Sequence, residues 1–370
     1  MEFIPSMSLF SVYDDNIYAR VDGSAGHLLQ LRPSFEGSYE NPRTRLLGLY
    51  SFDAQRSNFA TLNTLDARRH ALIETRFRTT PFTTLAMAGR YDRSETPGDI
   101  DMDSGILGER RQAQRLELNP TYAHRFTTRT SMTAGYDWTT ENLIDGERGT
   151  MHIGRAMLSR EVTEKTTLSA GYVARYFVDH IADHTSQGLV VGWNRELGPA
   201  TRISLFAGPK VTSYRGLTPE ANAAFMRTTN RIRLAIDYWH GETIILGVVG
   251  PVRADSVTLR SAWPLTRRFE LSAHAGASDV TTLDERKSTN YRSTLGLSWT
   301  PGGLYTVGAS YGLDYQDGLI RNRVFLDGEP IRYDDQILRH VFRVSLTVAP
   351  RYSRSILPPD EAARSKGVSR

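Results

Sequence analysis

The amino-acid sequence predicts a membrane-spanning, antiparallel, up-and-down β-barrel of about 18 strands. Three observations support this prediction: apolar and polar residues alternate along short segments, these segments recur at a regular spacing, and their connections alternate between short and long. The stretch "TTRTSMTAGYDWTTEN", residues 127–142, shows the alternation, with Met132, Ala134, Tyr136 and Trp138 on one face. A period of two is typical of a β-strand that meets different surroundings on its two sides.

The overall composition of the chain does not distinguish a membrane barrel from a soluble protein. The chain has 370 residues, of which 39% are hydrophobic, and its mean hydropathy is −0.40. Its most apolar run, "TIILGVVGPV", is shorter than the roughly 18 apolar residues that a membrane-spanning helix needs. A barrel strand does not need such a run, because only every second residue faces lipid.

Charge and cysteine content exclude several classes of protein. The chain has no cysteine, which rules out disulfides, thiolate nucleophiles and cysteine-ligated metals. Its 45 basic and 41 acidic residues are spread along the chain, so we expect no nucleic-acid partner. The start, "MEFIPSMSLF", lacks the features of a secretion signal, and we expect a mature chain whose signal peptide has been removed.

The alternating segments repeat along the chain. Aligning five of them places Ala134, Ala170, Ala207, Ala275 and Ala309 at equivalent outward positions. The spacings are 36, 37, 68 and 34 residues, and 68 corresponds to two units. A period of about 35 residues fits a two-stranded hairpin with its loops.

The connections are predicted to be of two kinds. Eight are tight and rich in turn-forming residues: "ENPRT", "TTPFTT", "RFTTRT", "EVTEKT", "RELGPAT", "HGET", "PLTRR" and "TPGG". Nine are mostly longer, and include "DDNIYARVDGSAGH", "RSETPGDIDMDSGILGERR", "RGLTPEANAAFMRTTN" and "QDGLIRNRVFLDGEPIRYDD". Seventeen connections imply 18 strands; 16 is the alternative, and it depends on the loop after "IILGVVG". Short periplasmic turns, long extracellular loops and an even strand number are typical of outer-membrane barrels.

The two ends of the chain are expected to close the barrel. Residues 7–13 would then pair with residues 342–348. Closure satisfies every backbone N–H and C=O group in hydrocarbon, which an open sheet cannot do.

Aromatic residues gather at the predicted strand ends. We predict an aromatic girdle made of Trp138, Tyr176, Trp193, Trp239, Trp263, Trp299 and Tyr315. Tryptophan and tyrosine prefer the boundary between water and lipid. The alternative, that aromatic residues simply favour strands, does not explain why these cluster at strand ends.

The polar face of the strands is predicted to line a lumen. The candidate lumen-lining residues are Arg175, Arg231, Arg233, Asp237, Arg260, Glu270, Arg292, Asp314, Arg339 and Arg343. The arginines either form a basic track for an anionic solute or pair across strands with the carboxylates and stiffen the wall. About 18 strands enclose a water-filled channel unless loops plug it.

The N-terminal stretch "IPSMSLFSVYDDNIY", residues 4–18, resembles the start of the type 2 β-barrel porins, outer-membrane proteins often associated with exopolysaccharide systems of Gram-negative bacteria. The resemblance rests on the "PS"-containing strand and on Tyr13, Asp14, Asp15 and Asn16. It implies a pore in contact with outer-membrane lipid and lipopolysaccharide that works with a periplasmic polysaccharide-export protein. Many such barrels end on an aromatic residue, whereas this chain continues past "SLTVAP". We expect a barrel over residues 1–351 and a polar, disordered periplasmic tail over 352–370.

Two motifs contain residue types that can ligate a metal ion. "DIDMDSG", residues 99–105, has acids at three EF-hand positions, but Ser104 and Arg110 replace the required glycine and glutamate. A solvated acidic loop is favoured over a looser Ca²⁺ site. His180 and His184 lie in a loop where no helix fixes their spacing, so we predict no metal and no cofactor.

The sequence shows no motif of a hydrolase, a nucleotide-binding protein or a dehydrogenase, and we predict that the protein is not an enzyme. The favoured function is an outer-membrane porin or channel for transport of a hydrophilic solute. The expected transport is exopolysaccharide export, in which the solute is a secreted polysaccharide. The alternative is a non-conducting barrel that anchors a larger surface assembly; a soluble secreted β-protein is a third. The sequence leaves open the solute, the partner, the oligomeric state and whether the lumen is plugged.

Overall fold

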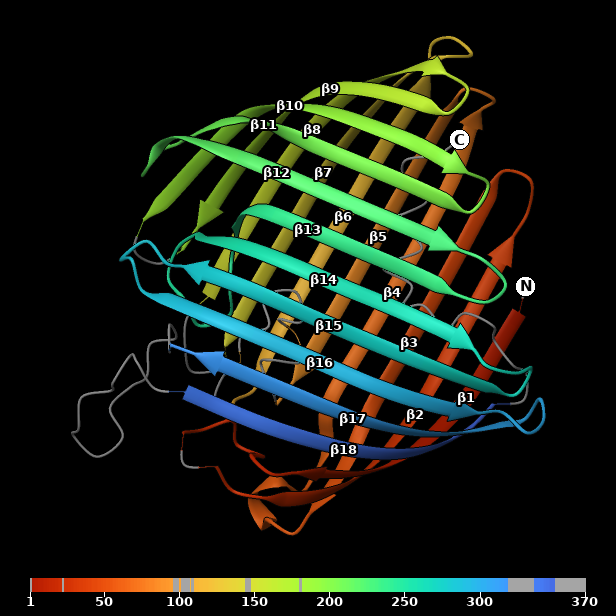
Figure 1. The fold of residues 1–370 in the computed structure, drawn as a ribbon, viewed down its shortest axis with the longest axis vertical. Coiled ribbons are helices and arrows are strands. Elements are labelled where there is room, and N and C mark those ends of the chain that lie inside the picture. The colour runs from red at the N-terminus through yellow and green to blue at the C-terminus, as the bar shows by residue number, and fades with distance from the viewer. Residues whose placement is uncertain are drawn as a thin grey trace.

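The computed structural model describes residues 2–21, 23–95, 100, 107, 110–143, 148–179, 182–318 and 336–349. Over these residues the chain forms one closed sheet of 18 antiparallel strands, drawn in Figure 1 as a tilted barrel. The predicted fold class and the predicted count of 18 are therefore confirmed. The described residues also contain a three-residue 3-10 helix, η1 (Ala60–Leu62), and none of their helices is long and apolar enough to span a membrane.

The strands follow one another around the barrel. They are β1 (Glu2–Asp14), β2 (Gly26–Glu40), β3 (Thr44–Ser57), β4 (Thr64–Thr80), β5 (Thr83–Ser94), β6 (Ala113–Arg125), β7 (Thr130–Leu143), β8 (Arg148–Thr163), β9 (Thr166–Val178), β10 (Asp183–Gly198), β11 (Thr201–Thr212), β12 (Gly216–Thr228), β13 (Arg233–Thr243), β14 (Val252–Pro264), β15 (Phe269–Thr281), β16 (Lys287–Trp299), β17 (Tyr305–Asp317) and β18 (Gln336–Val348). β18 returns to β1, with Met7 opposite Val348 and Tyr13 opposite Phe342. This confirms the seam predicted from the sequence.

The two ends of the barrel differ in their connections. At one end, called here the turn end, eight short turns join the strands: 41–43, 81–82, 126–129, 164–165, 199–200, 229–232, 265–268 and 300–304. The N-terminus also lies at this end, at the right of Figure 1. The opposite end, called the loop end, carries the longest connections, 15–25, 95–112 and 318–335, but the connections 144–147, 179–182 and 213–215 are short as well.

The middle of the chain differs from the prediction. Residues 215–230, predicted as a long loop, contain β12, and "IILGVVG", predicted as a strand, lies in the connection 244–251. β13 therefore runs opposite to the predicted direction, and "HGET", predicted as a tight turn, continues β13 to the loop end. The alternation in β12 is weakened by Pro219, which lies opposite Pro209 of β11, and by small alanines. β12 adds one strand that was not predicted, and the loss of the predicted strand at "IILGVVG" removes one. The strand count is therefore unchanged.

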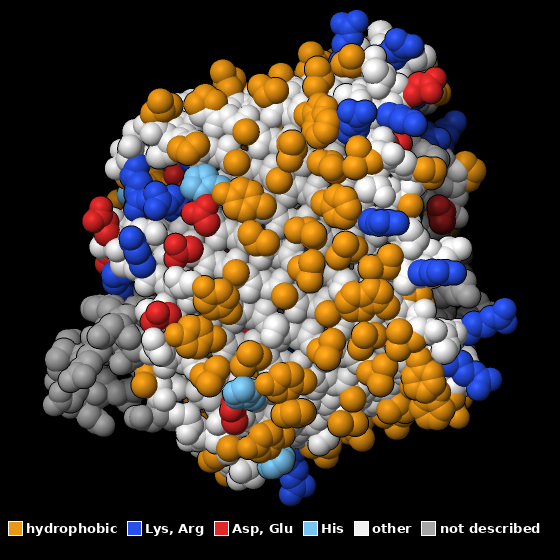
Figure 2. All heavy atoms as spheres, viewed as in Figure 1, with side chains coloured by type: hydrophobic (Ala, Val, Ile, Leu, Met, Phe, Trp, Pro, Cys, Tyr) orange, Lys and Arg blue, Asp and Glu red, His pale blue; other side chains and the backbone are white. Residues whose placement is uncertain are grey.

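Large apolar side chains cover the outside of the barrel. Leu189 and Val191 on β10 are 63% and 64% exposed, and Val344 on β18 is 55% exposed. Figure 2 shows such side chains spread across the middle of one face, with the charged side chains concentrated toward its edges. A soluble protein rarely exposes so much contiguous apolar surface, whereas a transmembrane barrel presents an apolar band to lipid. The alternate residues of each strand face inward.

Candidate functional site: the inner wall of the barrel

Arginine–carboxylate pairs line the inner wall. Arg260 Nη2 lies 2.5 Å from Asp237 Oδ2, and Arg292 Nε lies 2.8 Å from Asp314 Oδ1, in both cases between neighbouring strands. Two further pairs bridge strands that are not neighbours, Arg175 of β9 with Glu220 of β12, and Arg233 of β13 with Glu270 of β15. These contacts fit the reading in which the arginines stiffen the wall. Because each charge is matched, they leave little net positive field.

Two of the candidate lumen residues have other surroundings: one lies in a turn and the other contacts an aromatic ring. Arg231 is in the turn 229–232, where its backbone N–H donates to Thr229 Oγ1 at 3.2 Å, and its side chain is exposed. The reversed direction of β13 places this residue between strands. Arg343 lies opposite Val12 of β1, with its guanidinium 5.8 Å from the centre of the Phe10 ring.

A chain of charged groups crosses the closing seam. Arg339 of β18 donates through Nη2 to Asp14 Oδ2 at 2.6 Å and through Nε at 3.0 Å. Its Nη1 lies 3.7 Å from Asp314 Oδ2, and Asp314 also accepts from Arg292. Arg292, Asp314, Arg339 and Asp14 therefore connect four successive strands, β16, β17, β18 and β1. Asp14 is fully buried, so its charge depends on this partner.

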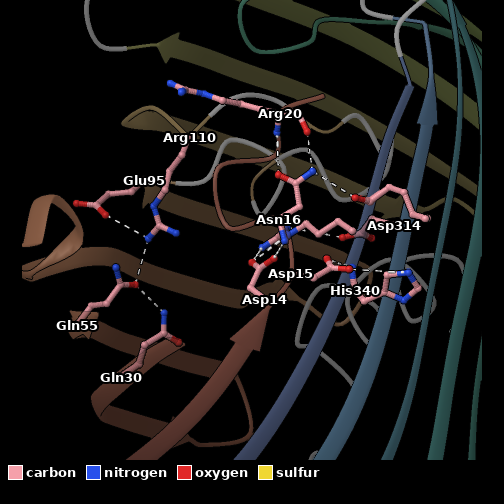
Figure 3. Close-up of polar contacts among 12 residues, drawn as sticks. Asp14, Asp15, Asn16, Arg20, Gln30, Gln55, Glu95, Arg110, Asp314 and His340 are labelled. Atoms are coloured by element: carbon pink, nitrogen blue, oxygen red, sulfur yellow. Dashed lines mark hydrogen bonds and ion pairs between the residues drawn. The ribbon is translucent and has the colours of Figure 1, made fainter. Parts of the chain in front are cut away.

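The motif that carries the porin resemblance fastens the first loop to β18. Asp15 accepts the backbone N–H of His340 at 2.6 Å, and its own N–H donates to the His340 carbonyl at 3.1 Å. Asn16 donates through Nδ2 to the carbonyls of Arg20, at 2.6 Å, and Leu338, at 3.2 Å. Figure 3 shows Asp14, Asp15 and Asn16 gathered beside His340. Three consecutive side chains of this motif thus hold the loop end of the seam.

The first loop turns into the barrel. Ile17 is 1% exposed and packs with Val12, Leu28 and Leu62. Ala19 packs with Leu107 and Ile337.

The connection after β5 is tied to the same region. Arg110 donates from its backbone N–H to the Tyr18 carbonyl at 3.2 Å, and its Nη2 lies 3.2 Å from Gln55 Oε1 and 3.3 Å from Glu95 Oε2. In Figure 3 its guanidinium lies between these two side chains. The described residues of these two connections are therefore anchored on the inner wall.

The connection 244–251 crosses the interior. Its residues enter three buried apolar clusters: Ile244 with Met151, Phe177 and Ile153; Leu246 with Ile100, Ala113 and Leu143; Ile245 and Val248 with Val252, Ala254, Val280 and Trp239. These partners lie on β6 to β9, on β13 to β15 and in the connection after β5. The most apolar run of the sequence is thus buried inside the barrel and narrows it toward the loop end.

Trp239 differs from the other predicted girdle residues. It shares the inner face of β13 with Asp237 and packs on the cluster around Ile245. Trp239 faces inward because it lies two residues from Asp237 on the same strand, and the direction of β13 brings it close to the connection 244–251. Trp193, Trp263 and Trp299 lie toward the turn end, and Trp138, Tyr176 and Tyr315 lie toward the loop end. Rings of neighbouring strands pair there, as in Trp299 with Phe269 and Tyr315 with Tyr291, with centroids 6.1 Å apart in both cases.

The candidate lumen residues named from the sequence leave out several inner-wall groups. Lys210 Nζ lies 3.4 Å from Glu242 Oε2, and both side chains are almost fully buried. Arg155 Nη2 lies 2.7 Å from Asp137 Oδ1, and Arg115 Nε lies 3.2 Å from Glu141 Oε1. The alternation of β11 could have revealed Lys210, which is in phase with Gly208 and out of phase with the exposed Leu205.

Of the first candidate metal motif, residues 99–105, only Ile100 is described, and of the two histidines of the second motif, His180 lies outside the described residues. His184 is described, and its ring lies edge-on to Tyr214 at 5.4 Å. Within the described ranges, no three histidine or carboxylate side chains are grouped closely enough to hold a metal ion.

No protein-family model matches this chain, and no curated protein matches it. Among solved structures it is similar to OccK11 (OpdR) of Pseudomonas aeruginosa, with a TM-score of 0.46 and 10% identity over 94% of this chain and 95% of that one. It is also similar to the siderophore receptor PirA of Pseudomonas aeruginosa (TM-score 0.41, 11% identity, 94% and 80%) and to the FrpB iron transporter of Neisseria meningitidis (0.42, 9%, 94% and 83%). The resemblance to the type 2 porins stays a prediction, and the barrel architecture rests on this chain's own strand pairing.

Proposed function

We propose that the protein is a pore of the bacterial outer membrane through which a hydrophilic solute diffuses. One observation carries this proposal: a closed ring of 18 strands turns charged and polar side chains inward and large apolar side chains outward. Barrels of 16 to 18 strands are too wide for their own inner side chains to fill. In such barrels the turn end faces the periplasm and the loop end faces the outside of the cell.

We further propose that the solute is a secreted polysaccharide delivered by a periplasmic export protein. The support for this cargo is the N-terminal resemblance carried by Tyr13 to Asn16. The inner wall suits a chain rich in hydroxyl groups, because paired guanidinium and carboxylate groups offer both donors and acceptors.

The second candidate is a barrel closed by its own loops that anchors a surface assembly without conducting. The observation that favours it is the connection 244–251, whose Ile244, Ile245 and Leu246 are all buried against inner walls. A segment held this firmly either narrows a pore or closes it.

Planar-bilayer recording of the purified barrel separates the two functions. A pore gives conductance steps of porin size, whereas silence from protein shown to be folded and inserted would support the anchoring barrel. Replacing residues 245–249 by glycine and serine should increase the step size of a pore. In a plugged barrel the same replacement should convert silence into steps. Replacing residues 265–268, in a turn at the opposite end, is the control and should change neither result.

A further inference from the structure

The turns of the turn end are strongly basic. Their tips carry Arg43, Arg129, Lys165, Arg231, Arg267 and Arg268, against the single carboxylate of Glu164. All six basic side chains are exposed. Figure 2 shows more lysine and arginine than aspartate and glutamate side chains along the edge of the barrel where the turns lie. An excess of one sign at one end indicates an anionic partner there.

Strand alternation decides which side of the barrel that partner approaches. On the inner face near the turns, both signs occur: Arg45 lies opposite Glu40, Arg202 Nη2 lies 2.6 Å from Glu196 Oε1, and Arg233 pairs with Glu270. On the outer face the described strand ends carry only cations, namely Arg160, Arg195 and Arg227. The charge excess therefore points away from the lumen and toward the membrane.

These three arginines belong to one repeated unit. In each unit the arginine lies directly opposite a threonine that opens a neighbouring strand: Arg160 opposite Thr130, Arg195 opposite Thr166 and Arg227 opposite Thr201. In each, the N–H that follows the arginine donates to the carbonyl that precedes the threonine, at 2.8 Å: Glu161 to Arg129, Glu196 to Lys165 and Thr228 to Ala200. The units occupy β8, β10 and β12, so neighbouring arginines are about 10 Å apart across the sheet.

Each arginine lies near the turn-end margin of the apolar band, which Val162 and Leu197 continue by one outward position beyond Arg160 and Arg195. Two residues earlier on the same face stand Leu158, Trp193 and Phe225. An arginine stem can follow such an apolar surface while its guanidinium reaches the water boundary. At that boundary the first groups a guanidinium meets are lipid headgroups.

We propose that the three units bind the phosphate groups of anionic phospholipids in the periplasmic leaflet. A guanidinium presents a flat fork of donors that matches two phosphate oxygens, and the threonine hydroxyl supplies a further donor. The first two units add a second cation at the turn, Arg129 or Lys165, whereas the third has Ala200 at that position. The β8 and β10 units therefore bind more tightly than the β12 unit. This inference rests on the proposed membrane location and not on conduction.

The test uses full-length protein freed of lipid in a neutral detergent. Native mass spectrometry and thermal unfolding are followed while phosphatidylglycerol or phosphatidylcholine is added. Wild-type protein should retain phosphatidylglycerol and gain thermal stability from it, but not from phosphatidylcholine. Each of Arg160→Gln and Arg195→Gln should weaken phosphatidylglycerol binding about fivefold. Arg227→Gln should have a smaller effect, and the triple variant should lose most of the stabilisation.

The matched control is the triple variant Arg43→Gln, Arg267→Gln, Arg268→Gln, which removes the same charge from turn tips outside the three units. It should keep the response to phosphatidylglycerol. Equal losses in both triple variants would reduce the effect to overall charge and overturn the proposal. An equal stabilisation by phosphatidylcholine, or by inorganic phosphate at the same concentration, would also overturn it. Conductance of the Arg160, Arg195 and Arg227 triple variant should match wild type, so failure of the pore and failure of the lipid site are separable.

Discussion

Arg339 of β18 donates hydrogen bonds to Asp14 of β1 through both Nη2 and Nε, although 325 positions separate the two residues in the chain. This pair closes the ring of strands at its loop end, beside the backbone bonds between Asp15 and His340. Because Asp14 is fully buried, its carboxylate has exchanged water for this guanidinium.

Removing one partner of the Asp14–Arg339 pair should destabilise the barrel. We expect Asp14→Asn to lower the free energy of unfolding by about 3 kcal/mol, because it leaves the Arg339 guanidinium poorly compensated. The measurement is urea unfolding of the barrel in lipid vesicles. Glu196→Gln is the control, since the Glu196 side chain is 50% exposed and its pair with Arg202 should contribute less than about 1 kcal/mol.

The double variant Asp14→Asn, Arg339→Gln extends this test, because removing both charges should recover part of the lost stability. An Asp14→Asn barrel that unfolds at the wild-type urea concentration would contradict the role given to the seam pair.

A charged substitution should destabilise the barrel more on its outer face than on its inner face. Val191, at the centre of β10, faces lipid, and Val190 beside it faces the lumen. We expect Val191→Arg to destabilise the barrel by about 2–4 kcal/mol, because a guanidinium near the membrane midplane loses its hydration. Val190→Arg should cost clearly less. Equal losses of folding free energy in vesicles for the two variants would show that the assigned faces are incorrect.

Gly250 should be required for the path of the connection 244–251. Its φ is +74°, a conformation that side chains disfavour, and an added Cβ would lie 2.5 Å from Leu283 Cδ1. We expect Gly250→Ala to cost about 1–2 kcal/mol from the backbone alone and to shift the connection. Limited proteolysis and urea unfolding measure both effects. Gly302→Ala is the control, because no atom lies within 4 Å of the added Cβ; equal sensitivity of the two variants would refute the prediction.

Asp284, in the connection between β15 and β16, should titrate at an unusually low pH. Partial burial works to raise its pKa, but hydrogen bonds from Thr282 and Arg286 outweigh it and lower the pKa below the ordinary value of 3.8. Thr282 Oγ1 and Arg286 Nε lie 2.5 Å and 2.7 Å from its carboxylate oxygens. Since the folded pKa is depressed, the contribution of this carboxylate to local stability is present above about pH 4 and is lost as the pH falls through the folded value.

Carboxyl-carbon NMR shifts of the protein in detergent micelles measure this midpoint directly. Thr282→Val should move the midpoint back toward 3.8. A wild-type midpoint at or above 3.8 would show that burial, and not hydrogen bonding, dominates at Asp284.

Local alternation was sufficient to predict most of the barrel. The outward positions of Leu189, Val191 and Trp193 follow from a period of two, and so does the outer face shared by Met7 and Val348 at the seam. The prediction from alternation failed where the residues of a segment do not alternate clearly between apolar and polar. β12 carries Pro219 and three alanines, so it resembled a loop, whereas residues 244–249 are apolar and mostly β-branched and resembled a strand. The same reversal of direction brings Trp239 to the loop end and Arg231 to a turn of the turn end.

The sequence by itself determined the class of fold and the outer surface that meets lipid, because both depend on the period of residues along single strands. The tertiary structure alone decided that residues 244–251 lie inside the barrel, that Arg175 reaches Glu220 across intervening strands, and that Asp14 meets Arg339. These contacts join residues far apart in the chain. Only closure of the ring, which fixes the curvature of the wall and the space it encloses, brings them within reach of one another.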